Sequence, residues 1–224
     1  MDLSKASLAS AAWAFPLVGA IIGAFGAVCY MSAIWLGTSH IIAAWLAVFS
    51  QILLTGGLHE DGLADTADAL ASGRGLEKRL EIMRDSRIGS YGAIALIVAL
   101  SLRANAISEL TTIFAGFLIA GACSRAAIVV LIRALPPARK DGLAKTAGRP
   151  SLERTLAAVL FAILFIIIFC DLFAAIKFSI ALTATCFIAY TLTKKNFSGI
   201  TGDTLGAFQQ LIEIGIFIAL TMEI

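Results

Sequence analysis

Long apolar runs recur along the whole chain, and they constrain its fold more than any other feature. Several of them reach or approach the about 20 mostly apolar residues that a helix needs to cross a bilayer. Hydrophobic residues make up 59% of the 224 residues, and charged residues only 14%. A soluble domain of this length could not cover that much apolar surface with polar groups, whereas a bilayer removes the requirement. The sequence therefore predicts an all-α fold, a polytopic membrane helical bundle that forms one membrane-embedded domain over residues 1–224.

Seven segments are candidate membrane-spanning helices. They are Trp13–Leu36, Ile41–Leu58, Tyr91–Leu102, Ile107–Leu135, Thr155–Cys170, Ile176–Leu192 and Thr204–Met222. The third is shorter than the roughly 17 to 25 residues of a full crossing, so it is either re-entrant or extends backward through Ile88. No A-x-A-like cleavage site follows the first apolar run, which indicates a permanent span rather than a signal peptide.

Lys and Arg are distributed unevenly between the two sets of connections. If the N-terminus is cytoplasmic, all of the 17 basic residues lie on the inside except Arg103 and Lys177 outside and Arg125 within a span. The positive-inside rule predicts such a bias when the assumed topology is correct. The C-terminus would then be periplasmic. Three polar regions would then face the cytoplasm: 59–90, 133–154 and 194–203. If the chain has an active site, these regions build it at the cytoplasmic face.

The cysteines and the net charge exclude some classes of function. The four cysteines lie in apolar runs without a CxxC pair, so we expect neither a disulfide framework nor a thiolate metal site. The formal net charge of +2 gives no indication of a nucleic-acid partner. The lipid bilayer is the expected partner, and the sequence leaves open whether copies of the chain form a homo-oligomer.

The densest polar motif is the run T-G-G-L-H-E-D-G-L-A-D-T-A-D over residues 55–68. Asp61, Asp65 and Asp68 are spaced so that all three fall on one face of a helix, with His59 on the opposite side. Three carboxylates on one face repel each other unless a cation neutralises them. Because no His or Cys accompanies this stripe, magnesium or manganese is favoured over zinc. A zinc protease would need a second histidine at position 63, which is Leu63.

The alternative interpretation of this motif is a solvated acidic helix end. The neighbouring glycines Gly56, Gly57 and Gly62 argue against it, because each glycine costs about 1 kcal/mol in a helix. They indicate instead a close approach of the backbone to a ligand or to another helix.

A second cluster follows at residues 81–92. Arg84 and Arg87 are three residues apart, so a helix predicted from Leu76 to Arg87 would present both to one anion, such as a phosphate. Asp85 would add a metal ligand or hold an arginine in place. The alternative is a solvated amphipathic helix.

Further polar residues lie within or beside the apolar runs. Ser124 and Arg125 fall inside a predicted span, where a charge costs at least about 2.5 kcal/mol and normally has a partner. Arg125 would meet a substrate phosphate or an active-site carboxylate, or form a structural ion pair. Asp203 would bind substrate or cap the last helix. Asp141 lies in a basic loop whose positive charge suits an anionic substrate.

The chain resembles the cobalamin synthase family, the adenosylcobinamide-GDP ribazoletransferases. The resemblance rests on the run from Gly56 to Asp68 and on Glu81–Gly89. Shorter matching blocks are Phe15–Gly19, Ser124–Arg125, Asp141–Leu143 and Thr201–Ala207. It implies a magnesium-dependent transferase that joins adenosylcobinamide-GDP to alpha-ribazole or its 5'-phosphate and releases GMP.

The resemblance and the motifs together give the expected roles of the site residues. Catalytic roles are expected for Asp61, Asp65, Asp68, Asp85 and His59, and the four aspartates are also the expected magnesium ligands. Asp65, at the centre of the stripe, is the expected general base. Substrate-binding roles are expected for Arg84, Arg87, Ser124, Arg125, Asp141 and Asp203.

Two other classes of membrane protein fit less well. CDP-alcohol phosphotransferases need an Asp three residues before the Asp-Gly pair and an Arg after the Ala, where this chain has Leu58 and Asp65. A secondary transporter would use Asp and Arg in an ion pathway near the membrane midplane. Here the acidic motif is predicted at a helix end, and no inverted repeat is evident.

Overall fold

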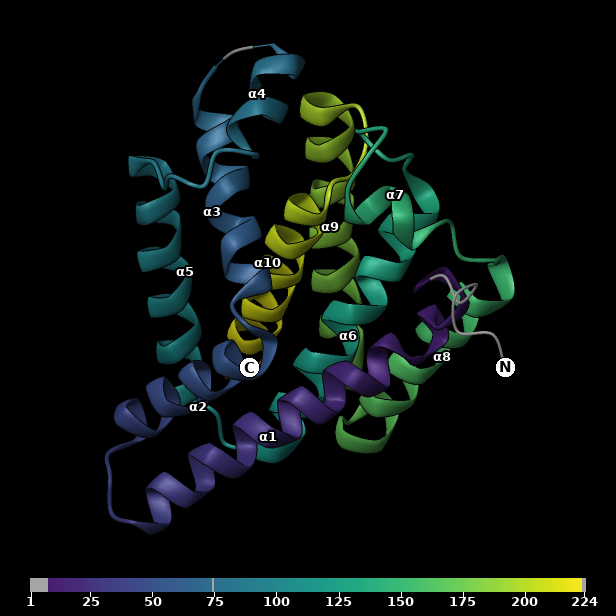
Figure 1. Cartoon of the computed structure of the whole chain (residues 1–224). Coiled ribbons are helices and arrows are strands. Elements are labelled where there is room, and N and C mark those ends of the chain that lie inside the picture. The colour runs from purple at the N-terminus through teal and green to yellow at the C-terminus, as the bar shows by residue number, and fades with distance from the viewer. Residues whose placement is uncertain (1–7, 74, 223–224) are drawn as a thin grey trace, which may run out of the picture.

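The computed structural model describes residues 8–73 and 75–222, apart from the side chains at 172–174, 177 and 181, and the described chain is built from helices (Figure 1). Two short 3-10 turns, η2 (Leu8–Ser10) and η3 (Ala12–Ala14), precede the first helix. The helices are α1 (Phe15–Trp35), α2 (His40–Thr55), α3 (Leu58–Ala71), α4 (Leu76–Ile82), α5 (Ser90–Ser108), α6 (Ile113–Ala134), α7 (Leu143–Ala147), α8 (Leu152–Phe169), α9 (Leu172–Phe197) and α10 (Gly202–Thr221).

The predicted helical membrane bundle is confirmed, but the count of about seven spans is not. Within the described residues, five helices are long and apolar enough to cross a membrane: α1 with the turn before it, α5, α6, α8 and α10. A sixth is added if α2 and α3, which meet at 92°, form one broken span. The third predicted span was too short, because α5 continues past Leu102 to Ser108 and reaches a full crossing length.

The outer surface of the bundle is strongly apolar. Large side chains such as Trp35 (84% exposed), Ile97 and Phe187 project away from the core on α1, α5 and α9. Soluble monomers rarely expose contiguous apolar patches of this kind. The lipid tails of a bilayer are the environment that such a surface requires.

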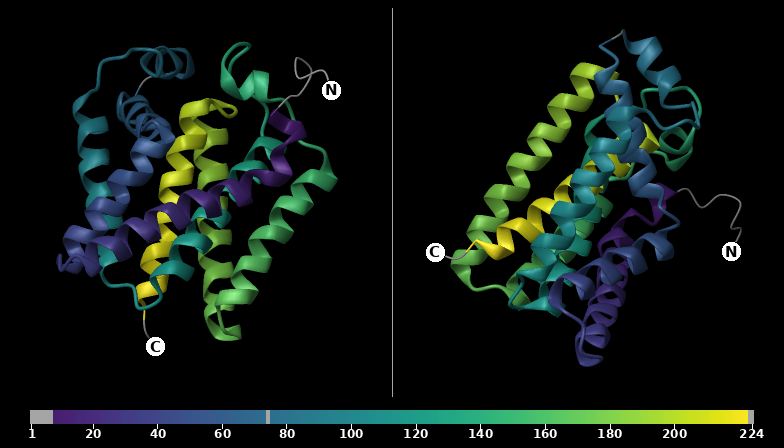
Figure 2. Two further views of the ribbon diagram at one scale, coloured as in Figure 1. Left: turned by 60° about the horizontal axis from the view of Figure 1, so that its bottom comes forward. Right: turned by 90° about the vertical axis from the view of Figure 1, so that its left-hand side faces the viewer.

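Helix α6 lies at the centre, and α1 packs against it through glycines (Figure 2). A β-carbon at Gly19 would lie 2.0 Å from the carbonyl oxygen of Gly121, and one at Gly121 would lie 2.1 Å from the oxygen of Gly19. The two backbones therefore touch directly. Lipid supplies no hydrophobic drive for helix association, so such close packing through small residues is a main source of attraction between spanning helices.

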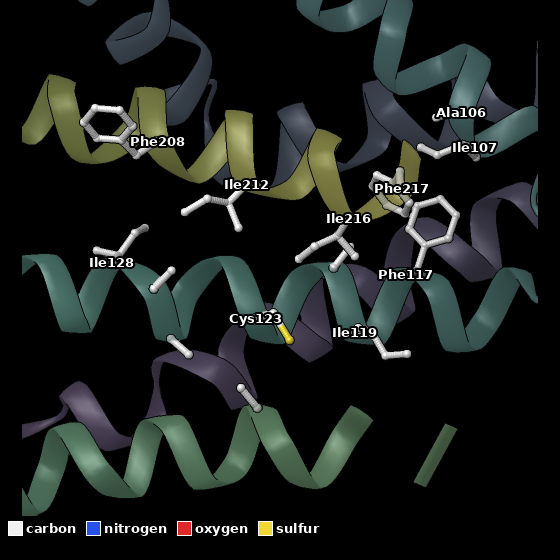
Figure 3. Packing of buried hydrophobic residues seen from close by; sticks show 14 of the residues in the cluster. Ala106, Ile107, Phe117, Ile119, Cys123, Ile128, Phe208, Ile212, Ile216 and Phe217 are labelled. Atoms are coloured by element: carbon white, nitrogen blue, oxygen red, sulfur yellow. The ribbon is translucent and has the colours of Figure 1, made fainter. Parts of the chain in front are cut away.

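The apolar core lies mainly between α6 and α10 (Figure 3). Phe117 of α6 and Phe217 of α10 meet edge to face, with ring centroids 5.3 Å apart. Ile212 and Ile216 fill the space further along α10. All four cysteines are free thiols, as predicted, and Cys123 is part of this core.

The three predicted polar regions meet at one end of the bundle, opposite the C-terminal end of α10 (Figure 2, left). Arg79 donates a hydrogen bond to the carbonyl of Asn196 (3.2 Å), and Arg139 donates to the carbonyl of Leu80 (2.9 Å). The backbones of Pro137 and Ile200 form an isolated parallel bridge. Three of the basic residues that predict the orientation fall outside the part of the chain that the structure describes: Lys5, Arg74 and the side chain of Lys177.

The contact between α1 and α6 predicts a specific sensitivity to side-chain size. Gly121→Leu should force the two backbones apart and lower the melting temperature in detergent by several degrees, since overpacking typically costs about 1–3 kcal/mol. Gly75→Ala is the matched control, because a β-carbon there meets no atom within 4 Å. Equal melting temperatures for the two variants would contradict this account of the packing.

Candidate active site

The acidic motif forms its own helix after a sharp turn. Gly56 and Gly57 both have left-handed backbone conformations, with φ of 66° and 69°, which residues with a β-carbon rarely adopt. This turn bends the chain by 92° between α2 and α3, and Asp61, Asp65 and Asp68 lie on a single helix, as predicted. The glycine pair therefore has a conformational role, in addition to any approach to a ligand.

A cavity of about 680 Å³ opens beside the acidic stripe. Its acidic lining residues come from three segments of the chain: Glu60, Asp61 and Asp65 from α3, Asp85 from the connection after α4, and Asp203 from α10. Among its lining residues, Arg84 is the one cation. This excess of carboxylates favours a bound cation, and it unites five predicted site residues: Asp61, Asp65, Arg84, Asp85 and Asp203.

The start of α10 reaches the cavity because Gly62 lets it approach α3. A β-carbon at position 62 would lie 2.6 Å from the carbonyl oxygen of Asp203 and 2.9 Å from its Cα. Any larger residue at 62 would therefore push Asp203 away from Asp61 and Asp65. The close approach to another helix that the glycines predicted is present here.

Asp68 has a structural task on the same helix. Its carboxylate accepts a hydrogen bond from the backbone N–H of Gly89 (2.7 Å) and another from that of Gly92 (2.9 Å). These two bonds fix the start of α5 onto α3. Because both carboxylate oxygens are engaged and Asp68 does not line the cavity, the structure does not bring it together with the other predicted metal ligands.

The predicted helix from Leu76 to Arg87 is shorter than expected. Helix α4 ends at Ile82, so Arg84 and Arg87 lie in the following connection and do not share a helical face. They also have different partners: Arg84 pairs with Asp141 (2.7 Å), and Arg87 pairs with Asp85 (2.6 Å). The prediction that both arginines face one anion is therefore not met in this structure.

The pair of Asp85 and Arg87 is exposed. Hydrogen bonds from Arg87 lower the pKa of the Asp85 carboxyl to about 2, so it stays ionised at neutral pH. Exposed pairs add little stability, because solvent screens them. The two charges of the pair are fixed relative to each other beside the cavity. Asp85 lines the cavity and Arg87 does not.

Asp203 lies in the first turn of α10 without being its cap. Thr201 is the N-cap residue and forms a reciprocal capping box with Thr204. The alternative interpretation of Asp203, as the cap of this helix, is therefore wrong. Its carboxylate, 3.7 Å from Arg139, instead contributes to the cavity wall.

A cluster of buried polar groups lies behind the cavity, in the interior of the bundle. Glu213 of α10 is fully buried and pairs with Arg125 of α6 and with Arg103 of α5, the latter at 2.5 Å. Gln209 and Ser124 also contact its carboxylate. Glu60 of α3 joins the cluster, since its Oε1 atom lies 3.5 Å from Nη1 of Arg103. The two arginines are therefore balanced by two carboxylates.

The cluster corrects the expected place of Arg103 and shows the surroundings of Arg125 and Ser124. Arg103 was assigned to a connection outside the membrane, but it lies in α5 and is only 2% exposed. Arg125 forms the ion pair with Glu213 that the sequence left open as an alternative, and neither Arg125 nor Ser124 lines the acidic cavity. Substrate binding by these two residues stays a prediction.

Glu60 connects the buried cluster to the cavity, and it was not among the predicted site residues. Its Oε1 atom accepts a hydrogen bond from Gln210 (2.8 Å), while its Oε2 atom is buried without a hydrogen-bond partner in the described part of the chain. Only its position between His59 and Asp61 marks it in the sequence. The predicted span ends at Leu102, directly before its partner Arg103, so the sequence did not indicate that Arg103 lies inside a helix of the bundle.

His59 lies away from the aspartates, on the side of α3 that the sequence predicted. It lines a separate, apolar cavity, with its Cα close to Gly206 of α10. The structure therefore does not bring His59 into the acidic cavity. Asp141 also lies outside the lining and reaches the cavity only through its pair with Arg84.

The donor atoms of the acidic cavity suit magnesium. Over residues 8–73 and 75–222, no three His, Cys, Asp or Glu side chains converge as a ready-made metal cage. Magnesium does not require one, since it commonly takes one or two carboxylates and completes its shell with water and substrate phosphates. Asp61 and Asp65, with Asp203 nearby, provide such a partial set.

The hydrogen bond between Glu60 and Gln210 allows an experiment in which the carboxylate and the amide exchange positions. Glu60→Gln should leave an unbalanced buried positive charge and destabilise the protein, toward the lower end of the about 3–5 kcal/mol seen when one partner of a buried pair is removed. Adding Gln210→Glu returns a carboxylate to the same hydrogen bond and should recover most of the loss in a detergent melting experiment. Glu81→Gln, in an exposed pair with Lys78, is the control and should be nearly neutral. A double variant no more stable than Glu60→Gln alone would refute the charge-balance argument.

Comparisons with known proteins cover almost the whole chain. A family model described as cobalamin-5-phosphate synthase matches residues 1–221. An adenosylcobinamide-GDP ribazoletransferase of Mesorhizobium japonicum is 39% identical over 228 residues, covering 100% of this chain and 87% of the relative. The protein of the same name from Azorhizobium caulinodans is 43% identical over 212 residues, covering 91% and 80%. No solved structure matches the chain significantly.

Proposed function

The chain belongs to the cobalamin-5-phosphate synthase family, and from this premise we propose that its acidic cavity is where adenosylcobinamide-GDP reacts with alpha-ribazole, or its 5'-phosphate, to release GMP. The chain is accordingly a membrane transferase of cobalamin biosynthesis, an adenosylcobinamide-GDP ribazoletransferase. The observation that carries the assignment of the site is the convergence of Asp61, Asp65 and Asp203 from two helices around one cavity.

The charge of the cavity supports a site for a metal-bound diphosphate. A diphosphate is strongly anionic, so a cavity lined by carboxylates would repel it unless a cation lies between them. Asp61 and Asp65 would hold Mg²⁺, with Asp203 beside them. Neutralisation of the charge that builds up on the transferring and leaving phosphates is the chemistry that bound Mg²⁺ supplies.

The carboxylates of the cavity also provide a proton acceptor. In the proposed step a ribazole hydroxyl, the 3'-hydroxyl by family resemblance, attacks the phosphorus on the cobinamide side. A new O–P bond forms, the bond from that phosphorus to the bridging oxygen breaks, and its electrons leave with GMP. The hydroxyl proton passes to a carboxylate. We propose Asp65 as this acceptor, and its half-buried position at the centre of the stripe supports the proposal.

Arg84 is the cation placed to meet the phosphates. It lines the cavity, and its guanidinium is held by two hydrogen bonds from Nη2 to the Asp141 carboxylate, at 2.7 and 2.8 Å. Asp141 would thus act through Arg84. Asp85 lines the same wall, so a role for it near the metal stays a prediction, and so do roles for Asp68, Arg87 and His59 in the reaction.

We further propose that the chain lies in the bacterial inner membrane with the acidic cavity toward the cytoplasm. The excess of basic residues in the three polar regions supports this orientation. Moving Arg103 from an outside connection into α5 strengthens the bias, because it leaves Lys177 as the one basic residue assigned to the outside.

The metal proposal predicts a loss of turnover in two variants. Asp61→Asn and Asp65→Asn keep the side-chain shape and remove the charge, so each should reduce GMP release by at least about 100-fold, as when one electrostatic group of an active site is lost. The measurement is GMP release against magnesium concentration with purified protein in detergent. Glu81→Gln removes an exposed carboxylate of α4 and should leave turnover unchanged. Wild-type rates and magnesium dependence in both Asn variants would place the metal elsewhere.

The orientation is tested by reporter fusions. Fusions after Gly75 and after Lys145 should both report a cytoplasmic location, since both positions belong to the basic polar regions. A periplasmic signal at either position would overturn the proposed orientation.

A further inference from the structure

A second, smaller cavity lies next to the acidic one and has the opposite chemistry. It measures about 220 Å³, and its described lining is apolar except for His59. The lining residues are Leu8, Phe15, Leu58, His59, Ile128, Ile132, Leu143, Ala144, Ala147, Gly202, Leu205 and Gly206. Nothing in the reaction described so far uses this cavity.

The two cavities lie on either side of the contact between α3 and α10. Leu58 lines both of them. On α10, Gly202 lines the apolar cavity and the next residue, Asp203, lines the acidic one. A molecule seated in the apolar cavity therefore lies beside the proposed reaction centre.

The parts of the two substrates differ in which cavity they fit. The diphosphate and the guanine nucleotide carry charges and polar edges that an apolar lining would leave unpaired, at a cost of several kcal/mol. The corrin ring is far larger than 220 Å³. The base of alpha-ribazole is a flat, mostly apolar bicyclic heterocycle, which matches both the size and the chemistry of the cavity.

We propose that this apolar cavity binds the heterocyclic base of the nucleoside substrate and selects among bases by size. The proposal rests on the proposed function. Phe15 offers an aromatic surface for the base, and His59 offers one ring nitrogen to a nitrogen of the base. His59 is then a substrate-binding residue and takes no part in proton transfer.

Filling the cavity provides the test. Ala147 is buried, lines this cavity and does not line the acidic one, so Ala147→Phe removes space without touching the carboxylates. The KM for alpha-ribazole should rise at least tenfold, the lower end of discrimination by an apolar pocket. The KM for the riboside of benzimidazole, a base that lacks the two methyl groups of the alpha-ribazole base, should rise much less. The KM for adenosylcobinamide-GDP should not change.

A variant that enlarges the cavity, instead of filling it, provides a second test. Ile132→Ala enlarges the same cavity and should shift the ratio of kcat/KM toward the larger base. Ala184→Phe adds the same bulk in the exposed groove between α8 and α9 and should leave that ratio unchanged. If both nucleosides lose activity equally in Ala147→Phe, or if only the KM for adenosylcobinamide-GDP rises, the cavity does not hold the base. Ala147→Leu replaces Ala147→Phe if the larger residue prevents folding.

A binding measurement separates this proposal from the proposed function. Equilibrium dialysis of alpha-ribazole with the wild-type protein, without adenosylcobinamide-GDP, should show binding that Ala147→Phe weakens and Asp61→Asn leaves intact. If the wild type binds the nucleoside but releases no GMP, the proposed reaction fails while the base site stands. If Ala147→Phe binds the nucleoside as tightly as the wild type, the base site fails.

Discussion

The ion pairs of Glu213 in the centre of the bundle are the interaction on which the other polar features depend. A carboxylate buried to this degree is tolerated only with full compensation, which Arg103 and Arg125 provide from two other helices. The pairs fix α5, α6 and α10 relative to one another at one depth. Neutral side chains could pack those helices, but they would not specify this register so narrowly, because an ion pair shifted by one helical turn leaves a buried charge unpaired.

The same cluster determines where the acidic cavity lies. Glu60 belongs to both, since its Oε1 atom is bonded to Gln210 while the residue also lines the cavity. The start of α3 is therefore tied to the buried charges of α5 and α10. The other end of the stripe is tied to the start of α5 by the bonds from Gly89 and Gly92 to Asp68. Asp61 and Asp65 lie between these two anchors and line the cavity, and neither carboxylate is engaged in an ion pair within residues 8–73 and 75–222.

The sequence was sufficient to predict the bundle and the acidic stripe, because both depend on local pattern. The length of the apolar runs predicts helices that cross a bilayer, and the i, i+4, i+7 spacing predicts that the three aspartates share one face of a helix. The sequence did not reveal the partners of Arg103, Arg125 and Asp68, which lie far away along the chain. Arg103 illustrates the difficulty: a charge at the end of an apolar run is typical of a connection, and only the position of Glu213 across the bundle explains why the helix continues past it. Helix α4 also ends earlier than predicted, and Arg84 beyond its end pairs with Asp141, which lies 57 residues further along the chain.

Four consecutive residues of α3 show how one helical turn serves four environments. Successive side chains of an α-helix point about 100° apart. His59 accordingly lines the apolar cavity, Glu60 reaches the buried charges, Asp61 lines the acidic cavity, and Gly62 touches the backbone of α10. None of these residue types could be exchanged with its neighbour, since each environment would then receive the wrong chemistry: a carboxylate against apolar side chains, or a β-carbon against a backbone. The order of this short motif is therefore explained by the positions of the surrounding helices. Because Gly62 lets α10 approach α3, Asp203 adds its carboxylate to those of α3 and increases the charge excess expected of a cation site.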